Sequence, residues 1–425
     1  MKKIYLSVIG FSIICSLNAY SQTRQDSIVN KPASVLNSVP IKDTTHYNPR
    51  KLELDEVNLF SSYYSQNGDH SAVTGGIGTE KVTDISNGIT LNFVWINKNL
   101  NKNTLNAGLG FDLHTAASQA FVSKTGASHT GGTRVYPSLD WTVENSKTGN
   151  TFGLGGYISY EYNYQSLGGD MHYSVKTEDK NGEFSAKLQA YYDLVTLIYP
   201  SEFVPASVYA TSYGTHRDGG GHRDNLGTSP RETFSASLSY SQIINSRLQV
   251  AFLADLVGQN GYLGLPFHRV YFSTGKDTIE KLPSSRYKLP LGARLNYFLG
   301  DNIILRTYYR YYLDSWGIRS NTANLEIAYK ISPFFSVSPF YRYYTQSAAR
   351  YFAPYEEHSP TDQYYTSNYE FSKFNSQFFG VGFRIAPPKG VFGWQNLHEL
   401  EIRYGHYSQT TDLVSNVVSL NLGFK

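Results

Sequence analysis

The sequence predicts an all-β fold, a transmembrane antiparallel up-and-down β-barrel of about 16 strands with both termini in the periplasm. Three observations support this prediction. Segments of about ten residues with alternating apolar and polar side chains recur along the chain, as in lipid-facing barrel strands. Long and short connections alternate between these segments. The chain also holds 36 Tyr, 24 Phe and 36 Gly but only 2 Met, a composition that favours β-structure over helix.

Residues 1–21 have the organisation of a signal peptide. Lys2 and Lys3 precede an apolar run, and Ala19 and Ser21 are the small residues expected before cleavage at Gln22. The run is shorter than the roughly 20 residues that a membrane-spanning helix needs. The only cysteine of the chain lies inside this run, so the mature protein is expected to contain no disulfide and no cysteine-based metal site.

Residues 22–50 are polar and contain several prolines, which predicts a mobile periplasmic N-terminal segment. A plug or docking peptide is the alternative. Residues 51–425 form the predicted barrel. Its strands are expected to begin near residues 53, 88, 103, 134, 150, 168, 182, 231, 247, 286, 302, 317, 334, 374, 397 and 412.

The connections between these segments fall into two sets. The long set comprises 67–87, 115–133, 195–230, 259–285 and 347–373, and the short set comprises 97–102, 145–150, 178–182, 244–247, 299–302 and 332–335. Long loops outside and short turns in the periplasm are the usual arrangement. A soluble β-sandwich is the rival fold, but the long hairpins and the aromatic residues at strand ends favour the barrel.

The last residues, VVSLNLGFK, alternate between apolar and polar side chains and resemble the insertion signal of outer-membrane barrels. This end of the chain therefore predicts an outer-membrane location. The expected partners are outer-membrane lipid, lipopolysaccharide and the barrel-assembly machinery. The formal net charge of +3 does not indicate a nucleic-acid partner, and no motif indicates a cofactor.

Strand alternation also assigns the side chains of residues 302–346 to two faces. Tyr309, Tyr311, Tyr341 and Tyr343 are expected to face lipid and to join an aromatic girdle. The side chains expected to line the lumen here and on neighbouring strands are Arg294, Arg306, Tyr308, Arg310, Tyr312, Asp314, Glu326, Arg342, Tyr344, Arg384, Glu399, Glu401 and Arg403. They form either a charge ladder that fixes strand register, or a cationic stripe in a pore that favours anions.

Three other polar motifs are candidate sites. The stretch HRDGGGHRD contains His216, Asp218, His222 and Asp224, which could bind a metal but better fit a solvated loop facing lipopolysaccharide. Asp112 and His114 could act as an acid–base pair, or could be structural. The glycine-rich TGGIGTE lacks the strand–loop–helix setting of a phosphate-binding loop.

Several segments have a distinctive order and spacing: TGGIGTEKVTDIS at 74–86, GYISYEYNYQSLGGD at 156–170, YYRYYLDSWGIRSNTANLEI at 308–327, SPFYRYYTQSAARYF at 338–352 and YYTSNYEFSKFNS at 364–376. Together they resemble the family of Gram-negative outer-membrane proteins known as domain of unknown function 3570. The resemblance implies a barrel in the outer membrane and small envelope lipoproteins as partners. It implies no activity.

The sequence therefore favours a non-enzymatic barrel that acts as a pore, or as the membrane component of an envelope assembly, with an arginine-lined inner wall. One alternative is a rim enzyme that acts on lipid or peptide through Asp112 and His114. Another is a surface receptor or scaffold that uses its long outer loops, chiefly 195–230 and 347–373.

Overall fold

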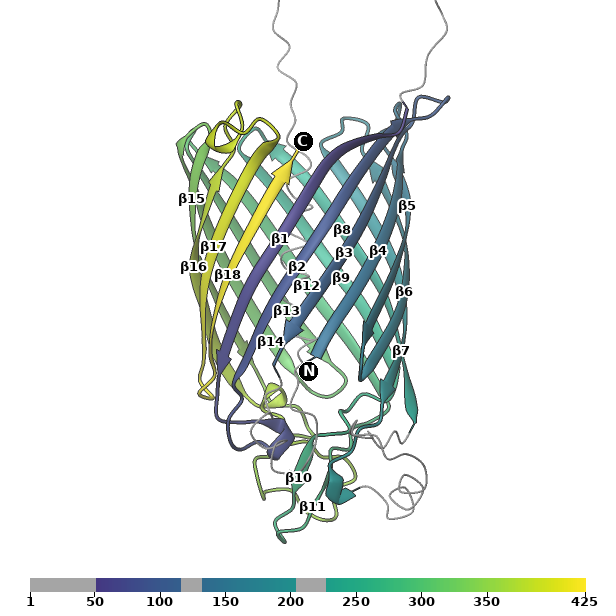
Figure 1. The fold of residues 1–425 in the computed structure, drawn as a ribbon, viewed down its shortest axis with the longest axis vertical. Helices are drawn as coiled ribbons and strands as arrows, with labels where there is room; N and C mark the ends of the chain where they lie inside the picture. Colours follow the sequence, from purple (N-terminus) through teal and green to yellow (C-terminus); the bar gives the residue numbers. More distant parts are fainter. Residues whose placement is uncertain (1–50, 116–131, 204–226) are drawn as a thin grey trace, which may run out of the picture. The chain divides into compact units, whose positions relative to one another are not determined.

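The computed structural model describes residues 51–115, 132–203 and 227–425, and within them sixteen antiparallel strands close into one barrel (Figure 1). The ring runs in the order β1-β18-β17-β16-β15-β14-β13-β12-β9-β8-β7-β6-β5-β4-β3-β2. The strands are β1 (Glu53–Asn67), β2 (Val82–Ile96), β3 (Lys102–His114), β4 (Gly132–Glu144), β5 (Thr151–Glu161), β6 (Tyr164–Lys176), β7 (Gly182–Thr196), β8 (Thr228–Asn245), β9 (Leu248–Gly261), β12 (Ser285–Leu299), β13 (Ile303–Asp314), β14 (Arg319–Ser332), β15 (Phe335–Gln346), β16 (Phe374–Ile385), β17 (Leu397–Gln409) and β18 (Val414–Phe424).

The predicted fold class is confirmed, and most strands begin within a few residues of the predicted positions. Two begin earlier: β2 at Val82 instead of near 88, and β6 at Tyr164 instead of near 168. In both cases pairing extends over a short added stretch, residues 82–87 or 164–167, that has one exposed apolar side chain, Ile85 or Leu167. At β6 it runs up to a tight turn in which Glu161 pairs with Tyr164. The first and last strands also pair along most of their length, from Val57 with Phe424 to Asn67 with Val414. No edge is left open, as a sheet in lipid requires.

The two ends of the barrel differ. Short turns gather at the end where β18 finishes, whereas the longer connections gather at the opposite end (Figure 1). The long-loop end carries β10 (Arg269–Tyr271), β11 (Asp277–Ile279), η1 (Ala72–Thr74), η2 (Ser201–Phe203) and η3 (Tyr369–Phe371), and η4 (Val391–Gly393) lies in the longest short-end connection. The predicted alternation of long and short connections holds for most of the ring, but the connections β5–β6, β13–β14 and β17–β18 at the long-loop end are also tight. That the short turns face the periplasm stays a prediction.

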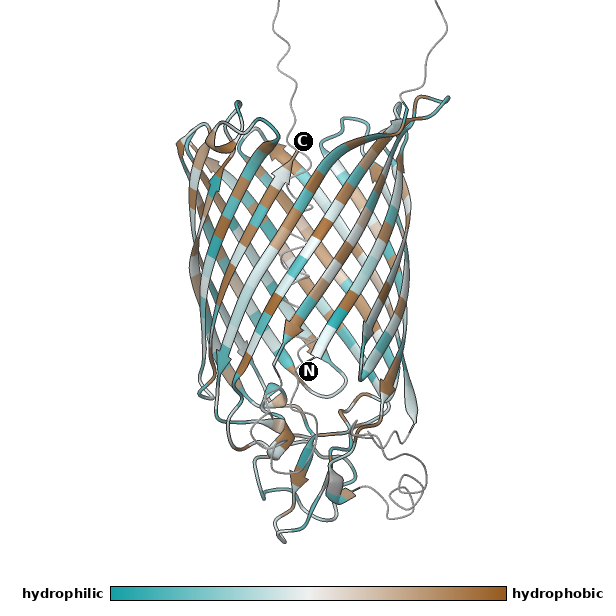
Figure 2. Cartoon of the chain, viewed as in Figure 1, coloured by the Kyte–Doolittle hydropathy of each residue, from teal (hydrophilic) through white to brown (hydrophobic). Residues whose placement is uncertain are grey.

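The outward face of the barrel is apolar. Leu154, Ile158, Leu188 and Leu238 are among many large apolar side chains that are exposed on strands, and Figure 2 shows apolar and polar residues alternating along each strand. Such a face suits contact with lipid hydrocarbon. On the tyrosine-rich strands, Tyr309, Tyr341 and Tyr343 are exposed in the same way, whereas Tyr311 is half-buried. Among the described residues, no helix is both long and apolar enough to span a membrane.

Connections from opposite sides of the ring meet at the long-loop end. The β1–β2 connection (68–81) and the β9–β12 connection (262–284) start eight places apart in the ring of sixteen. Nevertheless, Arg269 Nη1 donates to the carbonyl oxygen of Val73 at 2.8 Å, and Arg269 Nε lies 2.5 Å from Glu202 Oε1 in the β7–β8 connection. Contact between segments that start on opposite walls places them across the mouth of the barrel. We call the loop cap the β1–β2, β9–β12 and β15–β16 (347–373) connections together with residues 197–203 of the β7–β8 connection.

Buried polar contacts and close backbone packing stabilise the loop cap. Glu280 accepts hydrogen bonds from Thr366 Oγ1 at 2.5 Å and from the backbone N–H of Leu265 at 2.9 Å, so it joins two of the connections. Gly76 has a φ of +88°, and a Cβ there would lie 2.5 Å from the carbonyl oxygen of Ser367. The glycine-rich TGGIGTE therefore serves close packing within the cap.

Candidate functional site

The candidate site is the inner wall formed by β13 to β17. Glu326 on β14 accepts hydrogen bonds from Arg306 Nη1 on β13 and from Arg403 Nη2 on β17, both at 2.6 Å. The strands β14 and β17 are three places apart in the ring, about 14 Å at the usual strand spacing. Side chains that far apart can meet only over the concave inner face. These three residues therefore line the lumen, and we call this surface the arginine wall.

Within the arginine wall, phenylalanine rings lie close to glycines of the neighbouring strands. A Cβ at Gly405 would lie 2.5 Å from the Phe378 ring, and one at Gly380 would lie 2.8 Å from the Phe340 ring. The Arg403 guanidinium sits 5.2 Å from the centroid of Phe340. Stacking on an aromatic face stabilises the cation and holds it in one orientation.

Further ion pairs continue the wall towards the short-turn end. Arg384 donates to both carboxylate oxygens of Glu399, at 2.9 and 2.7 Å, and Arg403 Nη1 lies 3.1 Å from Glu401 Oε1. The first contact joins the adjacent strands β16 and β17, as a charge ladder does, and the second lies within β17. The ladder thus covers six of the candidates near this end of the lumen: Arg306, Glu326, Arg384, Glu399, Glu401 and Arg403.

Two arginines of the wall lie outside this ladder. Within residues 51–115, 132–203 and 227–425, neither Arg310 nor Arg342 forms an ion pair, and the Nε atom of each is inaccessible without a hydrogen-bond acceptor. The Arg342 guanidinium lies 5.7 Å from the Phe378 ring centroid. Tyr308 lies beside this pair in the strand register, and so does Tyr344, whose hydroxyl donates to Gln346 at 2.7 Å. The pair adds positive charge that no described carboxylate balances.

The remaining candidates have other surroundings. Asp314 is buried at the rim, where Tyr312 donates to it at 2.9 Å and Arg286 Nε does so at 2.9 Å. Arg286 also stacks on Trp316 at 4.4 Å, which anchors the tight β13–β14 turn to the loop cap. Arg294 lies on β12 opposite Tyr308 in the register. The candidates at the rim therefore act with Arg286, which the sequence analysis did not name.

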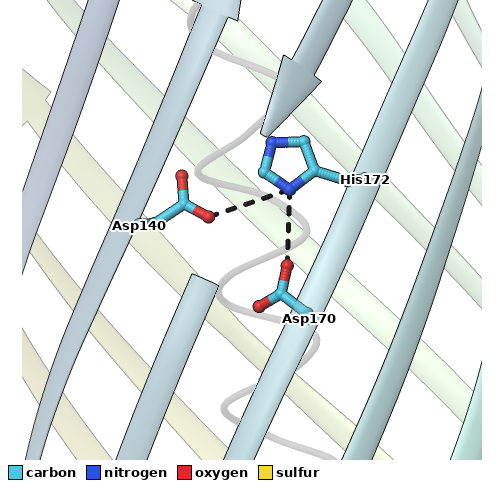
Figure 3. A group of neighbouring side chains, drawn as sticks. All are labelled: Asp140, Asp170 and His172. Atoms are coloured by element: carbon cyan, nitrogen blue, oxygen red, sulfur yellow. Dashed lines mark hydrogen bonds and ion pairs between the residues drawn. The ribbon is translucent and has the colours of Figure 1, made fainter. Parts of the chain in front are cut away.

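A second polar cluster lies on the opposite wall. His172 Nδ1 on β6 lies 3.3 Å from Asp170 Oδ1 on the same strand and 3.8 Å from Asp140 Oδ2 on β4 (Figure 3). Lys187 Nζ on β7 lies 3.1 Å from the same Asp170 oxygen. Thr142 Oγ1 lies 3.0 Å from the other ring nitrogen of His172. Two carboxylates and an imidazole are groups that can bind a metal ion.

This cluster forms because β5 offers glycine where β4 and β6 would otherwise be kept apart. A Cβ at Gly153 would lie 2.2 Å from His172 Nε2, and one at Gly155 would lie 2.3 Å from Asp170 Oδ2. This cluster was not predicted from the sequence. Its signal is an Asp-X-His spacing on one strand, with glycines at alternate positions of the strand before it.

The two clusters face each other across the lumen. β5 lies eight places from β15 in the ring of sixteen strands. Counted from the short-turn end, Asp170 and Arg403 are each the seventh residue of their strands, so their depths are similar. The lumen thus has arginines on one wall and a carboxylate cluster on the other.

The other sequence candidates do not come together as one site. Asp112 accepts from Arg134 Nε at 2.8 Å and from the Tyr136 hydroxyl at 2.9 Å, whereas His114 Nε2 lies 3.2 Å from Glu161. Asp112 and His114 therefore have separate partners. The motif with His216, Asp218, His222 and Asp224 lies outside the described residues, as do the predicted signal peptide and residues 22–50.

A family model described as "Protein of unknown function (DUF3570)" matches residues 112–416. The chain belongs to this family. The match includes both lumen walls. No curated protein matches the chain.

Among solved structures, the chain is similar to a bacterial polysaccharide outer membrane secretin, with 9% identity over 87% of this chain and 98% of that one and a TM-score of 0.42. It is similar to the outer membrane protein OprD from Pseudomonas aeruginosa, with 9% identity over 88% and 94% and a TM-score of 0.42. It is also similar to a loop-deletion mutant of OmpT from Vibrio cholerae, with 10% identity over 88% and 99% and a TM-score of 0.43.

Proposed function

We propose that this protein is an outer-membrane pore that favours small anions, with its short turns and both termini in the periplasm and no catalytic role. The observation that carries the proposal is the unbalanced pair Arg310 and Arg342 on the arginine wall. Guanidinium groups that face a lumen attract anions and present donors that match carboxylate and phosphate geometry. The ladder around Glu326 holds the wall in place beside them.

The opposite wall sharpens this proposal. Carboxylates at Asp140 and Asp170 face the arginines from β4 and β6, so the charge of the lumen is separated into two sides. A field across the lumen orients a polar solute as it passes. A dipolar anion would travel with its negative group along the arginine wall.

The loop cap bears on when the pore conducts. Because it spans the mouth, solutes would pass only when its segments separate. Arg269 joins three of those segments through Glu202 and Val73 and is the natural residue to change. We infer that the pore is gated at the long-loop end.

Planar-bilayer recording of the purified protein tests the proposal. In a salt gradient, the wild-type reversal potential should show a preference for chloride over potassium. The double variant Arg310→Gln/Arg342→Gln should reduce or reverse it. Arg247→Gln removes a charge at a short turn and serves as the matched control, for which no change is expected.

A variant of the loop cap extends the same experiment to the case in which the wild-type pore is seldom open. Arg269→Gln should raise the fraction of time spent open, because it removes the charged link between cap segments. If neither the wild type nor this variant conducts, the pore proposal is wrong. If both conduct but the arginine double variant keeps full anion preference, the assignment of selectivity to the arginine wall is wrong.

The loop cap also favours a second candidate, a surface receptor or scaffold. Buried contacts at Glu280 and a hydrophobic core around Trp316 and Phe371 hold its segments together. The loop cap therefore presents a preformed surface to a partner. Small envelope lipoproteins and lipopolysaccharide are the partners we propose for this role, and the barrel-assembly machinery is the partner proposed for insertion. Affinity purification from cross-linked envelopes tests it: a partner retained by the wild type should be lost when residues 355–363 are replaced by a glycine–serine linker.

A further inference from the structure

The cluster on the β4–β6 wall has donor atoms arranged around a common point. We propose that Asp140, Asp170 and His172 bind one divalent transition-metal ion, with Zn²⁺ as the representative ion. All three donor atoms lie within 4.8 Å of one another. Zn²⁺ takes both carboxylate oxygen and imidazole nitrogen as ligands, and one side would stay open to lumen water. The site lies outside the arginine wall that carries the proposed function.

The spacing of the donors fits tetrahedral coordination. Bonds of about 2.1 Å in a tetrahedron place neighbouring ligand atoms about 3.4 Å apart. His172 Nδ1 lies 3.3 Å from Asp170 Oδ1 and 3.8 Å from Asp140 Oδ2. Small side-chain rotations on a rigid sheet would complete the geometry. Figure 3 shows the same ring nitrogen pointing at both carboxylates.

The surroundings orient the imidazole as a ligand. Thr142 Oγ1 lies 3.0 Å from His172 Nε2 and also 3.2 Å from Asp140 Oδ1. When His172 donates its Nε2–H to Thr142, its Nδ1 lone pair faces two carboxylate oxygens, and a cation can bind between these three acceptors. A hydrogen bond from the non-ligating ring nitrogen is the usual support of a metal-binding histidine.

The backbone of β5 leaves room for the side chains of the cluster. β4 and β6 are separated by β5, and their inward side chains meet only because Gly153 and Gly155 have no Cβ. Each glycine costs a strand stability in comparison with alanine. The space left by the absent Cβ atoms of the two glycines is taken by the side chains of Asp170 and His172. This close packing is independent of the chemical type of the ligands.

Lys187 forms an ion pair that would compete with metal binding. Its ammonium lies 3.1 Å from Asp170 Oδ1, where it neutralises part of the charge that a metal ion would neutralise. The side chain is 39% exposed, so it can swing into the lumen when an ion binds. The alternative to metal binding is therefore a purely ionic cluster in which Lys187 and a protonated His172 balance the two carboxylates.

Calorimetric titration of the folded, full-length barrel in detergent with Zn²⁺ at neutral pH tests the proposal. The wild type should show one saturable site. His172→Gln and Asp170→Asn should each weaken binding at least tenfold, and His398→Gln, a histidine paired with Glu56 elsewhere, should not. Far-UV circular dichroism and thermal melting confirm that each variant is folded. Absence of saturable binding by the wild type, or full affinity in His172→Gln, overturns the proposal.

Two further variants separate a metal site from an ionic cluster. Gly155→Ala places a methyl group against Asp170 Oδ2 and should weaken Zn²⁺ binding, whereas Gly156→Ala, which has nothing within 4 Å of the new atom, should not. Lys187→Met removes the competing ammonium and should tighten binding severalfold. Unchanged or weaker binding in Lys187→Met contradicts the competition. Because binding is measured without conductance, failure of the pore proposal leaves this test intact.

Discussion

At the scale of single residues, Glu326 is the centre of the arginine wall. It is the shared acceptor of Arg306 and Arg403, which come from strands on either side of it, and its side chain is 13% exposed. The charges of both arginines are therefore partly neutralised by this one carboxylate. Loss of one partner of a poorly hydrated ion pair costs more than the pair contributes, because the remaining charges stay desolvated.

Replacement of Glu326 by Gln should therefore lower the free energy of unfolding by about 1–3 kcal/mol. Urea unfolding in lipid vesicles measures this change. Glu144→Gln is the matched control, since Glu144 pairs with Lys176 near a turn and its side chain is 38% exposed, and its loss should cost less than about 1 kcal/mol. Equal costs for the two variants would show that Glu326 is an ordinary surface carboxylate. The Gln variant should also raise anion preference in bilayers.

At the scale of elements, the loop cap contains two carboxyl groups outside the strands that favour the neutral form. Burial, followed by the nearby Asp69, raises the pKa of Glu80 from 4.5 to about 7. Burial also raises the pKa of Glu370 from 4.5 to about 8, and Glu80 contributes to this shift. Glu80 belongs to the β1–β2 connection and Glu370 to the β15–β16 connection. Ionisation of both therefore places like charges in two segments of the closed cap.

The sign of the pH effect follows from these shifts. The closed cap holds protons that an opened cap releases, so its stability is full below about pH 4.5 and is lost as pH rises through 7 to 8. Limited proteolysis of the 347–373 connection should accelerate between about pH 6 and 9. Glu370→Gln should flatten this dependence, and Glu357→Gln, at an exposed position of the same connection, should leave it unchanged. Faster cleavage at low pH would contradict the assignment.

At the scale of the whole molecule, the barrel separates an apolar outside from a polar inside along every strand. Leu238 on β8 is exposed on the outer face, and the next residue, Ser239, points to the lumen. A charge at position 238 would therefore contact lipid, whereas the same charge at position 239 would contact water in the lumen.

Leu238→Lys should lower the unfolding free energy in vesicles by about 2–4 kcal/mol, because an ammonium near the middle of the membrane loses its hydration. Ser239→Lys should change it by less than about 1 kcal/mol, since the lumen keeps the charge hydrated. Equal stability of the two variants would mean that the outer face does not contact lipid.

Much of this architecture could be predicted from local patterns. Alternation along Phe152–Tyr162 and along residues 303–313 identifies strands and their faces, because a side chain's face depends only on its place in a two-residue repeat. The early starts of β2 and β6 were not predicted, since each added stretch has a single exposed apolar side chain, Ile85 or Leu167, which is too few to establish an alternating pattern. Arg286 was not predicted because its partner Asp314 lies on the next strand of the barrel, and alternation along one strand does not show which side chains of two strands meet.

The strands, their faces, the connections and the family of this protein follow from the amino-acid sequence, because each depends on residues close together in the chain. Which side chains meet follows from the folded barrel. Glu326 and Arg403 join across two intervening strands, and Asp140 reaches His172 over the glycines of β5. Closure of the ring also set the two walls opposite each other and brought loops from opposite sides together. These contacts depend on the curvature and register of the closed sheet, which no local repeat encodes.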